Sequence, residues 1–190
     1  EDILAASRDL IKENGWAAVS IRAVASRCSV SAGTIYNYYE SKADLLSDTI
    51  ESIWHEIFFH PEDEQIFHDV ESCISWIYER LEYGNRQFPG FFSLHSFGFM
   101  RDEKTSGKKR MMKTWGHILN GLCEVLENDP KVRADVFDQE FTEKKFADIL
   151  FSLILVSMIR QDYDPSSVLM LVKKTLYVTV QSQAKFQKQV

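Results

Sequence analysis

Helical periodicity runs through almost the whole sequence and constrains its fold more than any other feature. Apolar residues recur three and four positions apart, Gly and Pro are few at 8 and 4, and no alternating run of β-branched residues interrupts them. The pattern therefore predicts an all-α protein with about nine helices. We place these helices at residues 3–14, 21–28, 32–38, 42–58, 64–85, 90–100, 107–128, 142–161 and 165–181.

Capping residues divide the N-terminal part of the chain into short helices. Gly15 is placed to end the first helix with a left-handed backbone, and Ser20, Ser31 and Ser41 are placed to cap the next three. Only residues 29–31 join the second helix to the third. A turn this short is what a helix-turn-helix requires, because its second helix projects at a steep angle into the DNA major groove.

The distribution of charge is uneven. The net charge of the whole chain is −6, which argues against a protein that coats nucleic acid without selectivity, since that task needs a broad positive field. Residues 20–42, however, contain Arg22, Arg27 and Lys42 against the single acid Glu40, a net of +2. Positive charge is therefore concentrated on the predicted helix-turn-helix, although we expect Arg27 itself to be merely solvated.

The same stretch resembles the N-terminal part of the TetR family of transcriptional regulators. The resemblance covers about residues 1–58 and rests on Ser20-Ile21-Arg22-x-Val24-Ala25, Val30-Ser31-x-Gly33-Thr34-Ile35-Tyr36-x-Tyr38-Tyr39 and Ser41-Lys42-x-x-Leu45-Leu46. Ser29 departs from it, because the family usually has Gly or another residue tolerant of positive φ there, and this departure predicts a slightly strained turn. The resemblance implies a three-helix DNA-binding domain at 1–46. It also implies a larger helical ligand-binding and dimerisation domain at 47–190, where it extends only to helix count and order.

The residue types on the predicted third helix suit DNA contact on chemical grounds alone. Gly33 lets the backbone approach a phosphate, and Thr34 offers a methyl group to thymine and a hydroxyl to phosphate. Tyr36 and Tyr38 are long amphipathic side chains suited to phosphate or sugar. Asn37 carries the amide that pairs with adenine, although a plain surface polar residue is the competing interpretation. The predicted DNA-contacting residues are Ser20, Arg22, Ser31, Gly33, Thr34, Tyr36, Asn37, Tyr38 and Lys42.

Catalytic and metal-binding patterns are weak in this sequence. His55 and His60 stand five positions apart instead of the four of a zinc-protease helix, so they do not share one helix face. Gly-rich phosphate loops and nucleophile elbows are missing from the sequence. Cys28, Cys73 and Cys123 have the spacing of reduced, packed thiols. The sequence therefore predicts no enzyme activity, no cofactor and no metal site.

Aromatic residues gather in the predicted C-terminal domain. Five phenylalanines lie between residues 88 and 99 around a single histidine, and a further Trp and His follow on the next long helix. Such a cluster is either a hydrophobic core or the lining of an apolar ligand pocket with a few orienting polar groups, and the sequence leaves both interpretations open. The residues predicted to line such a pocket are Phe91, Phe92, His95, Phe99, Trp115 and His117.

The last two long helices carry more apolar surface than one chain can bury. The helix at 142–161 is apolar nearly all round, and the helix at 165–181 repeats the problem, so we expect a homodimer whose interface is a twofold four-helix bundle. Such a dimer holds two recognition helices about one DNA turn apart, roughly 34–36 Å, and matches a pseudo-palindromic operator. The predicted dimer residues are Phe151, Leu155, Met158, Val172 and Leu176.

Segments for membrane insertion or export are not evident in the sequence. The longest nearly apolar run, residues 149–159, is well short of the roughly 20 residues needed to cross a bilayer. The chain begins with Glu1-Asp2, without Met and without the layout of a signal peptide, so we expect residues before Glu1 and a cytoplasmic location.

The leading functional hypothesis is a sequence-specific DNA-binding transcriptional regulator, a repressor that leaves its operator when a small, largely apolar ligand binds. Two rival hypotheses remain. The first is a regulator of the same fold that is controlled by a protein partner. The second is an enzyme or carrier on a helical bundle, which predicts no sequence-selective DNA binding.

Overall fold

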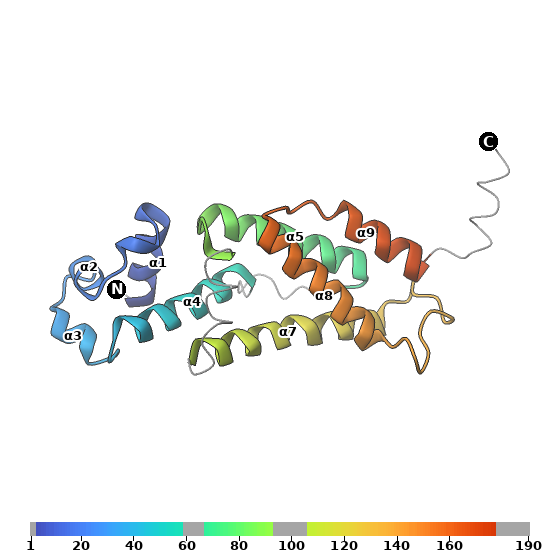
Figure 1. Cartoon of the computed structure of the whole chain (residues 1–190), viewed down its shortest axis with the longest axis horizontal. Coiled ribbons are helices and arrows are strands. Elements are labelled where there is room, and N and C mark those ends of the chain that lie inside the picture. The colour runs from blue at the N-terminus through green and yellow to red at the C-terminus, as the bar shows by residue number, and fades with distance from the viewer. Residues whose placement is uncertain (1–2, 59–66, 93–105, 178–190) are drawn as a thin grey trace. The chain divides into compact units, whose positions relative to one another are not determined.

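The computed structural model describes residues 3–58, 67–92 and 106–177, with the backbone alone for 106–114. These residues form helices without any strand among them, which confirms the predicted all-α fold (Figure 1). The elements are α1 (Ile3–Asn14), η1 (Trp16–Ala18), α2 (Ile21–Arg27), α3 (Ala32–Tyr36), α4 (Lys42–Phe58), α5 (Val70–Gln87), α7 (Ser106–Asn128), α8 (Glu143–Arg160), α9 (Ser166–Val172) and η2 (Lys173–Tyr177).

The chain divides into two compact units. The first unit comprises Glu1–Asp63 and Glu82–Thr114, and the second comprises Glu64–Leu81 and Trp115–Val190. Both α5 and α7 therefore contribute residues to each unit. The domain division proposed from the sequence, 1–46 and 47–190, stays a prediction, and α4 runs unbroken across it.

The predicted caps define the short helices of the first unit. The Ser20 hydroxyl accepts a hydrogen bond from the Ala23 N–H at 3.1 Å, and the Ser31 hydroxyl accepts one from the Thr34 N–H at 3.1 Å. These bonds satisfy backbone donors that the first turn of a helix leaves without partners. Gly15 has a φ of 77°, as expected at the end of α1, and the 3₁₀ turn η1 that follows it was not predicted.

Several helix boundaries differ from the sequence prediction. Helix α5 begins at Val70 instead of residue 64, because Asp69 accepts a hydrogen bond from the Ser72 N–H at 2.8 Å and caps the helix there. Helix α3 ends at Tyr36, two residues early. The last helix is α-helical only to Val172 and continues as the π-helical turn η2. Most of the helix predicted at 90–100 lies outside the described residues.

The second unit is organised around the buried carboxylate of Asp129, which is 5% exposed. One oxygen accepts hydrogen bonds from the Val70 N–H at 2.9 Å and from the Tyr177 hydroxyl, and the other accepts the Lys131 N–H at 2.8 Å. Burial, together with this carboxylate, raises the pKa of Tyr177. Asp129 thus ties the start of α5 and the turn η2 to the end of α7.

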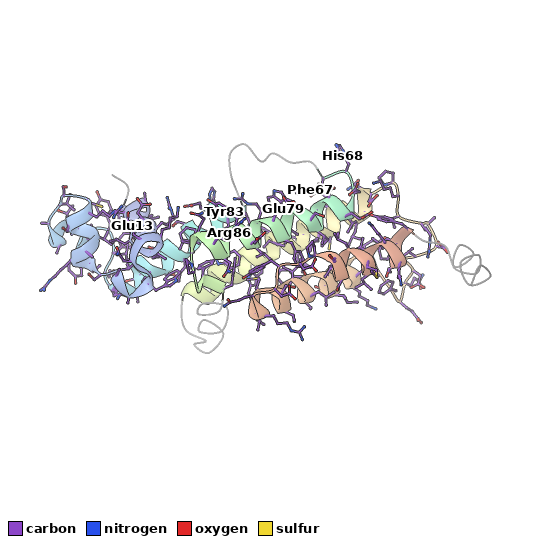
Figure 2. All side chains as sticks on the ribbon, turned by 90° about the horizontal axis from the view of Figure 1, so that it is seen from above. Glu13, Phe67, His68, Glu79, Tyr83 and Arg86 are labelled. Atoms are coloured by element: carbon purple, nitrogen blue, oxygen red, sulfur yellow. The ribbon has the colours of Figure 1, made fainter. Side chains whose placement is uncertain are left out.

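Other contacts of the second unit are aromatic or neutral polar. The Tyr78 hydroxyl on α5 lies 2.9 Å from the Ser157 hydroxyl on α8. Phe67, which with His68 leads into α5, packs its ring 5.2 Å from that of Trp76 (Figure 2). Burial raises the pKa of the Cys73 thiol to about 12, as expected of a packed, unreactive cysteine. Among the described helices, none is long and apolar enough to span a membrane.

Candidate nucleic-acid interface

The turn between α2 and α3 has the geometry of a helix-turn-helix. Ser29 has a φ of 58°, a left-handed conformation that costs a non-glycine residue energy, so the strain predicted at this position is present. The Val30 N–H donates to the Ala25 carbonyl at 2.9 Å, which closes the turn. Ala25 and Ile35 are buried where α2 and α3 meet, and they hold the two helices together.

The opposite face of α3 is exposed. The side chains of Tyr36 and Tyr38 are 56% and 71% exposed, and Asn37 is exposed between them as the C-terminal capping residue. Large aromatic side chains this exposed are unusual on a monomer surface unless they serve a contact with another molecule. The structure therefore brings together three of the residues predicted to contact DNA.

Ser31, Gly33 and Thr34 lie at the start of α3. A Cβ added to Gly33 would meet only the Ser31 hydroxyl, at 3.5 Å, so the backbone there is open to close approach. The Thr34 and Ser31 hydroxyls lie 3.0 Å apart, and both Ser20 and Ser31 already cap helices. These serines have a structural role in addition to the DNA contact predicted for them.

The cations near the helix-turn-helix differ in their surroundings. Arg22 and Lys42 are exposed. Arg27, which the sequence analysis expected to be merely solvated, instead donates two hydrogen bonds of 2.6 Å to the carboxylate of Glu13, a residue labelled in Figure 2. The hydrogen bonds from Arg27 lower the pKa of Glu13. The ion pair neutralises Arg27, so the positive field over α2 and α3 is weaker than the count of +2 suggests.

Ion pairs join α1 to α4, the helices that precede and follow the helix-turn-helix in the sequence. The sequence analysis did not predict these ion pairs. The Glu56 carboxylate on α4 accepts from Arg8 at 2.9 Å and from Lys12 at 2.6 Å. The Lys12 ammonium also lies 4.9 Å from the centre of the Phe88 ring. The spacing of Arg8 and Lys12, four residues apart on one face of a helix, was the available signal.

An aromatic cluster, here called the Phe91 junction, joins η1 to α4 within the first unit. The Phe91 ring stacks on Trp16 at 5.8 Å with an interplanar angle of 10°, and it lies 5.2 Å from Trp54 of α4. Phe92 lies 5.3 Å from Phe91 and 5.6 Å from Trp54. Each of Phe91 and Phe92 is only 1% exposed. Their rings therefore pack as those of a hydrophobic core do, and the ligand-binding role that the sequence suggested for them stays a prediction.

The remaining residues predicted to line a ligand pocket lie in different parts of the chain, and the pocket itself stays a prediction. Trp115 is buried in the second unit, whereas Phe91 and Phe92 belong to the first. His117 lies on α7 and is exposed. His95 and Phe99 lie outside the described residues.

The predicted dimer residues fall into two groups. Phe151 and Leu155 on α8 are half-buried. Met158, Val172 and Leu176 are 2% exposed or less, because they pack in the core of the second unit, and they cannot form an outer surface. The sequence pattern did not separate inward from outward apolar positions here. The exposed apolar residues of α8 and α9 are Ile149, Val156, Ile159, Met170 and Leu171.

Comparison with known proteins identifies the N-terminal region. Residues 3–49 match the family described as bacterial regulatory proteins, tetR family. The HTH-type transcriptional regulator UidR of Escherichia coli (strain K12) is 38% identical over 48 residues, a match that spans 25% of this chain and 24% of UidR.

Solved structures resemble the chain over most of its length. A transcriptional regulator from Rhodococcus sp. Rha1 aligns with a TM-score of 0.65 and 16% identity, covering 93% of this chain and 97% of that one. FadR from Bacillus subtilis in complex with stearoyl-CoA aligns with a TM-score of 0.56 and 15% identity, covering 90% and 92%. These structures share the fold, while residues 3–49 carry the family match. The N-terminal region, residues 3–49, is therefore similar to the tetR family of bacterial regulatory proteins.

Proposed function

We propose that this protein is a transcriptional regulator that binds a pseudo-palindromic site in double-stranded DNA. The observation that carries the proposal is the exposed face at the end of α3, where Asn37 lies between Tyr36 and Tyr38 in the sequence. The exposed cations Arg22 and Lys42 lie on α2 and α4, the helices before and after α3. The tyrosines and cations suit the DNA backbone, and the Asn37 amide suits an adenine edge. The family match of residues 3–49 supports the same assignment, and we expect a protein with this function to act in the cytoplasm.

Selection of bound sequences from random DNA tests this proposal, followed by affinity measurements on the selected site. Asn37→Ala should relax base choice at one position in each half-site, because its amide makes the base contact. Lys42→Ala should weaken binding to all sequences and reduce the salt slope by about one, because it neutralises a phosphate. Lys144→Ala is the matched control, since it removes another exposed lysine, from α8. Unchanged affinity and salt slope in both test variants would refute the assignment.

We propose further that the protein is a homodimer formed by α8 and α9. Support comes from the exposed apolar side chains of Ile149, Val156, Ile159 and Met170, which exceed what a monomer's surface helix ordinarily shows. Ile159→Glu should lower the mass in solution from dimer to monomer, because it places a charge on this surface without disturbing the core. Leu176→Glu is unsuitable as a test, since Leu176 is 0% exposed and its replacement would unfold the chain. A wild-type protein that is monomeric at micromolar concentration would refute the proposal.

We infer that the protein is a repressor that a small, largely apolar ligand releases from DNA. The C-terminal helices carry the fold of FadR, whose structure holds stearoyl-CoA, so the fold can accommodate a ligand with a long apolar chain. Helix α4 is suited to transmit the signal, because its first residue is the exposed Lys42 and its last turns pack on the Phe91 junction. A displacement at that end would shift α1 and the helices that read DNA.

Operator affinity measured with and without candidate ligands tests the inference. A ligand that raises the melting temperature should weaken operator binding by about 5–150-fold, and operator DNA should weaken ligand binding by the same factor. Ligands that bind without changing operator affinity would refute the coupling. Control by a protein partner would then become the better account.

A further inference from the structure

Trp115 is a buried hydrogen-bond donor without an acceptor among the described residues. Its side chain is 9% exposed, and its indole Nε1 has essentially no accessible surface and no hydrogen-bond partner. Buried donors in folded proteins almost always have a partner, so each exception requires an explanation. Two other buried polar groups of the same unit have partners: the Tyr78 hydroxyl pairs with Ser157, and Asp129 accepts three hydrogen bonds.

Among the described residues, the side chain recorded in contact with the Trp115 ring is aromatic, and buried residues near it on α7 and α8 are apolar. The indole ring of Trp115 meets the Phe151 ring of α8 edge-on at 5.8 Å with an interplanar angle of 69°. Leu122 and Leu126 continue along α7 as buried residues, and Leu150 and Ile154 are the buried residues of α8 on either side of Phe151. A single N–H in apolar surroundings is how binding sites for small apolar molecules fix the orientation of one polar atom.

The charge of a hydrogen-bond acceptor determines whether it can be buried beside the Trp115 N–H. Among the described residues, the buried polar or charged side chains are Ser7, Ser47, Thr49 and Asp129, and none of them is a cation. A carboxylate brought to Trp115 would lose its hydration without gaining the charge of a buried cation from the described part of the chain, which is unfavourable. A neutral oxygen loses much less on burial and still accepts the indole N–H.

We propose that the Trp115 Nε1–H is the polar anchor of the effector site, and that the effector is an uncharged, largely apolar molecule with an oxygen acceptor such as a ketone. This inference rests on the proposed effector control and specifies the class of ligand. Trp115 then determines specificity: it favours a neutral oxygen over a hydrocarbon of the same shape and over a carboxylate.

Four probes of known chemistry test the inference on the full chain without DNA. Acetophenone and 2-decanone supply a neutral carbonyl on an aromatic and on an aliphatic body. α-Methylstyrene has the shape of acetophenone without an oxygen, and benzoate has a similar shape with a charge. The indole N–H resonances of ¹⁵N-labelled protein report binding, with Trp115 assigned by its loss in Trp115→Phe. A ketone should move the Trp115 resonance downfield and leave the Trp76 resonance in place, because only the former N–H gains an acceptor.

Affinities separate a specific anchor from general apolar binding. The wild type should bind at least one ketone about tenfold more tightly than α-methylstyrene or benzoate, because a site that presents a buried donor rejects analogues without an acceptor. Trp115→Phe should lose this preference and bind α-methylstyrene like the wild type. Trp76→Phe, in the same unit, should keep it.

Three results would overturn the inference: a Trp115 resonance that neither ketone moves, equal affinity for acetophenone and α-methylstyrene, or a preference that survives in Trp115→Phe. The resonance of the wild type decides the first of these even if the variant folds poorly. Because these titrations contain no DNA, their failure leaves the proposed DNA binding intact. A failure to select any DNA sequence would in turn count against the proposed function alone.

Discussion

Replacing Phe91 by Leu should separate the contribution of the Phe91 junction from that of the rest of the first unit. Phe91 is 1% exposed and its ring lies near four others, at 5.2 Å from Trp54, 5.3 Å from Phe92, 5.8 Å from Trp16 and 6.3 Å from Phe88. Leu keeps most of the apolar volume but loses the ring contacts. The change therefore tests the stacking itself.

The expected loss of stability follows from these contacts. An aromatic pair contributes about 0.5–1.5 kcal/mol beyond its buried area, so four independent pairs would give about 2–6 kcal/mol. The four share one ring and are not additive, and Leu recovers part of the burial, so we expect a loss of about 2–3 kcal/mol. Operator affinity should fall at least about fivefold as well, because Trp16 loses the stacking partner that links η1 to α4.

Urea unfolding followed by circular dichroism measures the stability, and titration of selected DNA measures the affinity. Phe141→Leu is the control, since Phe141 is half-buried in the second unit and packs on two rings, Phe137 at 5.8 Å and Phe146 at 5.7 Å. The Phe141→Leu substitution should lower the free energy of unfolding by about 1 kcal/mol and leave DNA binding unchanged. If Phe91→Leu lowers the free energy of unfolding no more than Phe141→Leu does, and binds DNA like the wild type, the Phe91 junction does not stabilise the DNA-binding arrangement of the helix-turn-helix.

Three further predictions concern Ser29 in the turn between α2 and α3, Asp69 at the start of α5, and the buried carboxylate of Asp129. Ser29→Gly should raise the free energy of unfolding by up to about 1 kcal/mol, because Gly adopts the φ of 58° without strain. The control Ser26→Gly, inside α2, should lower the free energy of unfolding by about 1 kcal/mol. Urea unfolding of both variants measures these two changes. The Lys131 ammonium and Ser72 hold the pKa of Asp69 at about 2, below its unfolded value of about 3.9, so the stability that Asp69 contributes is present above about pH 4 and is lost as the pH falls through 2. The difference in unfolding free energy between wild type and Asp69→Asn should therefore shrink over that interval, and a constant difference would contradict the assignment. Asp129→Ala should lower the free energy of unfolding by about 2–4 kcal/mol, because it leaves the buried Val70 N–H without its acceptor. Tyr177→Phe should lower it by about 1 kcal/mol, because it removes one hydrogen bond to Asp129. Urea unfolding measures both losses.

The N-terminal part of the fold could be predicted closely because its signals are local. A serine at a helix start forms its hydrogen bond to a donor three residues away, as Ser20 and Ser31 do, so the sequence alone contains both partners. The exposed positions of Tyr36, Asn37 and Tyr38 follow from the burial of Ile35 on a short helix. Even the strain at Ser29 could be expected, because a non-glycine residue stands where the turn needs a positive φ.

The C-terminal contacts join residues far apart in the sequence and therefore left no local signal. The start of α5 at Val70 depends partly on Asp129, which lies 59 residues later. Apolar periodicity identified α8 as buried on several sides but could not say that Met158 faces the core while Ile159 faces out. The exposure of His117 and the burial of Phe91 likewise depend on which helices pack together, and a single amphipathic pattern does not determine that.

The structure also changes how a signal would reach the helix-turn-helix. The sequence suggested one route, through α4 as a rigid lever. In the first unit, however, α1 and η1 contact the segment after α5 directly, because Trp16 stacks on Phe91 and Lys12 lies over Phe88. Glu56 separately ties α1 to α4 through Arg8 and Lys12. A displacement of residues 88–92 would therefore act on α1 directly as well as through α4, and α2 and α3 would move with α1 because α1 packs on α2 and α2 on α3.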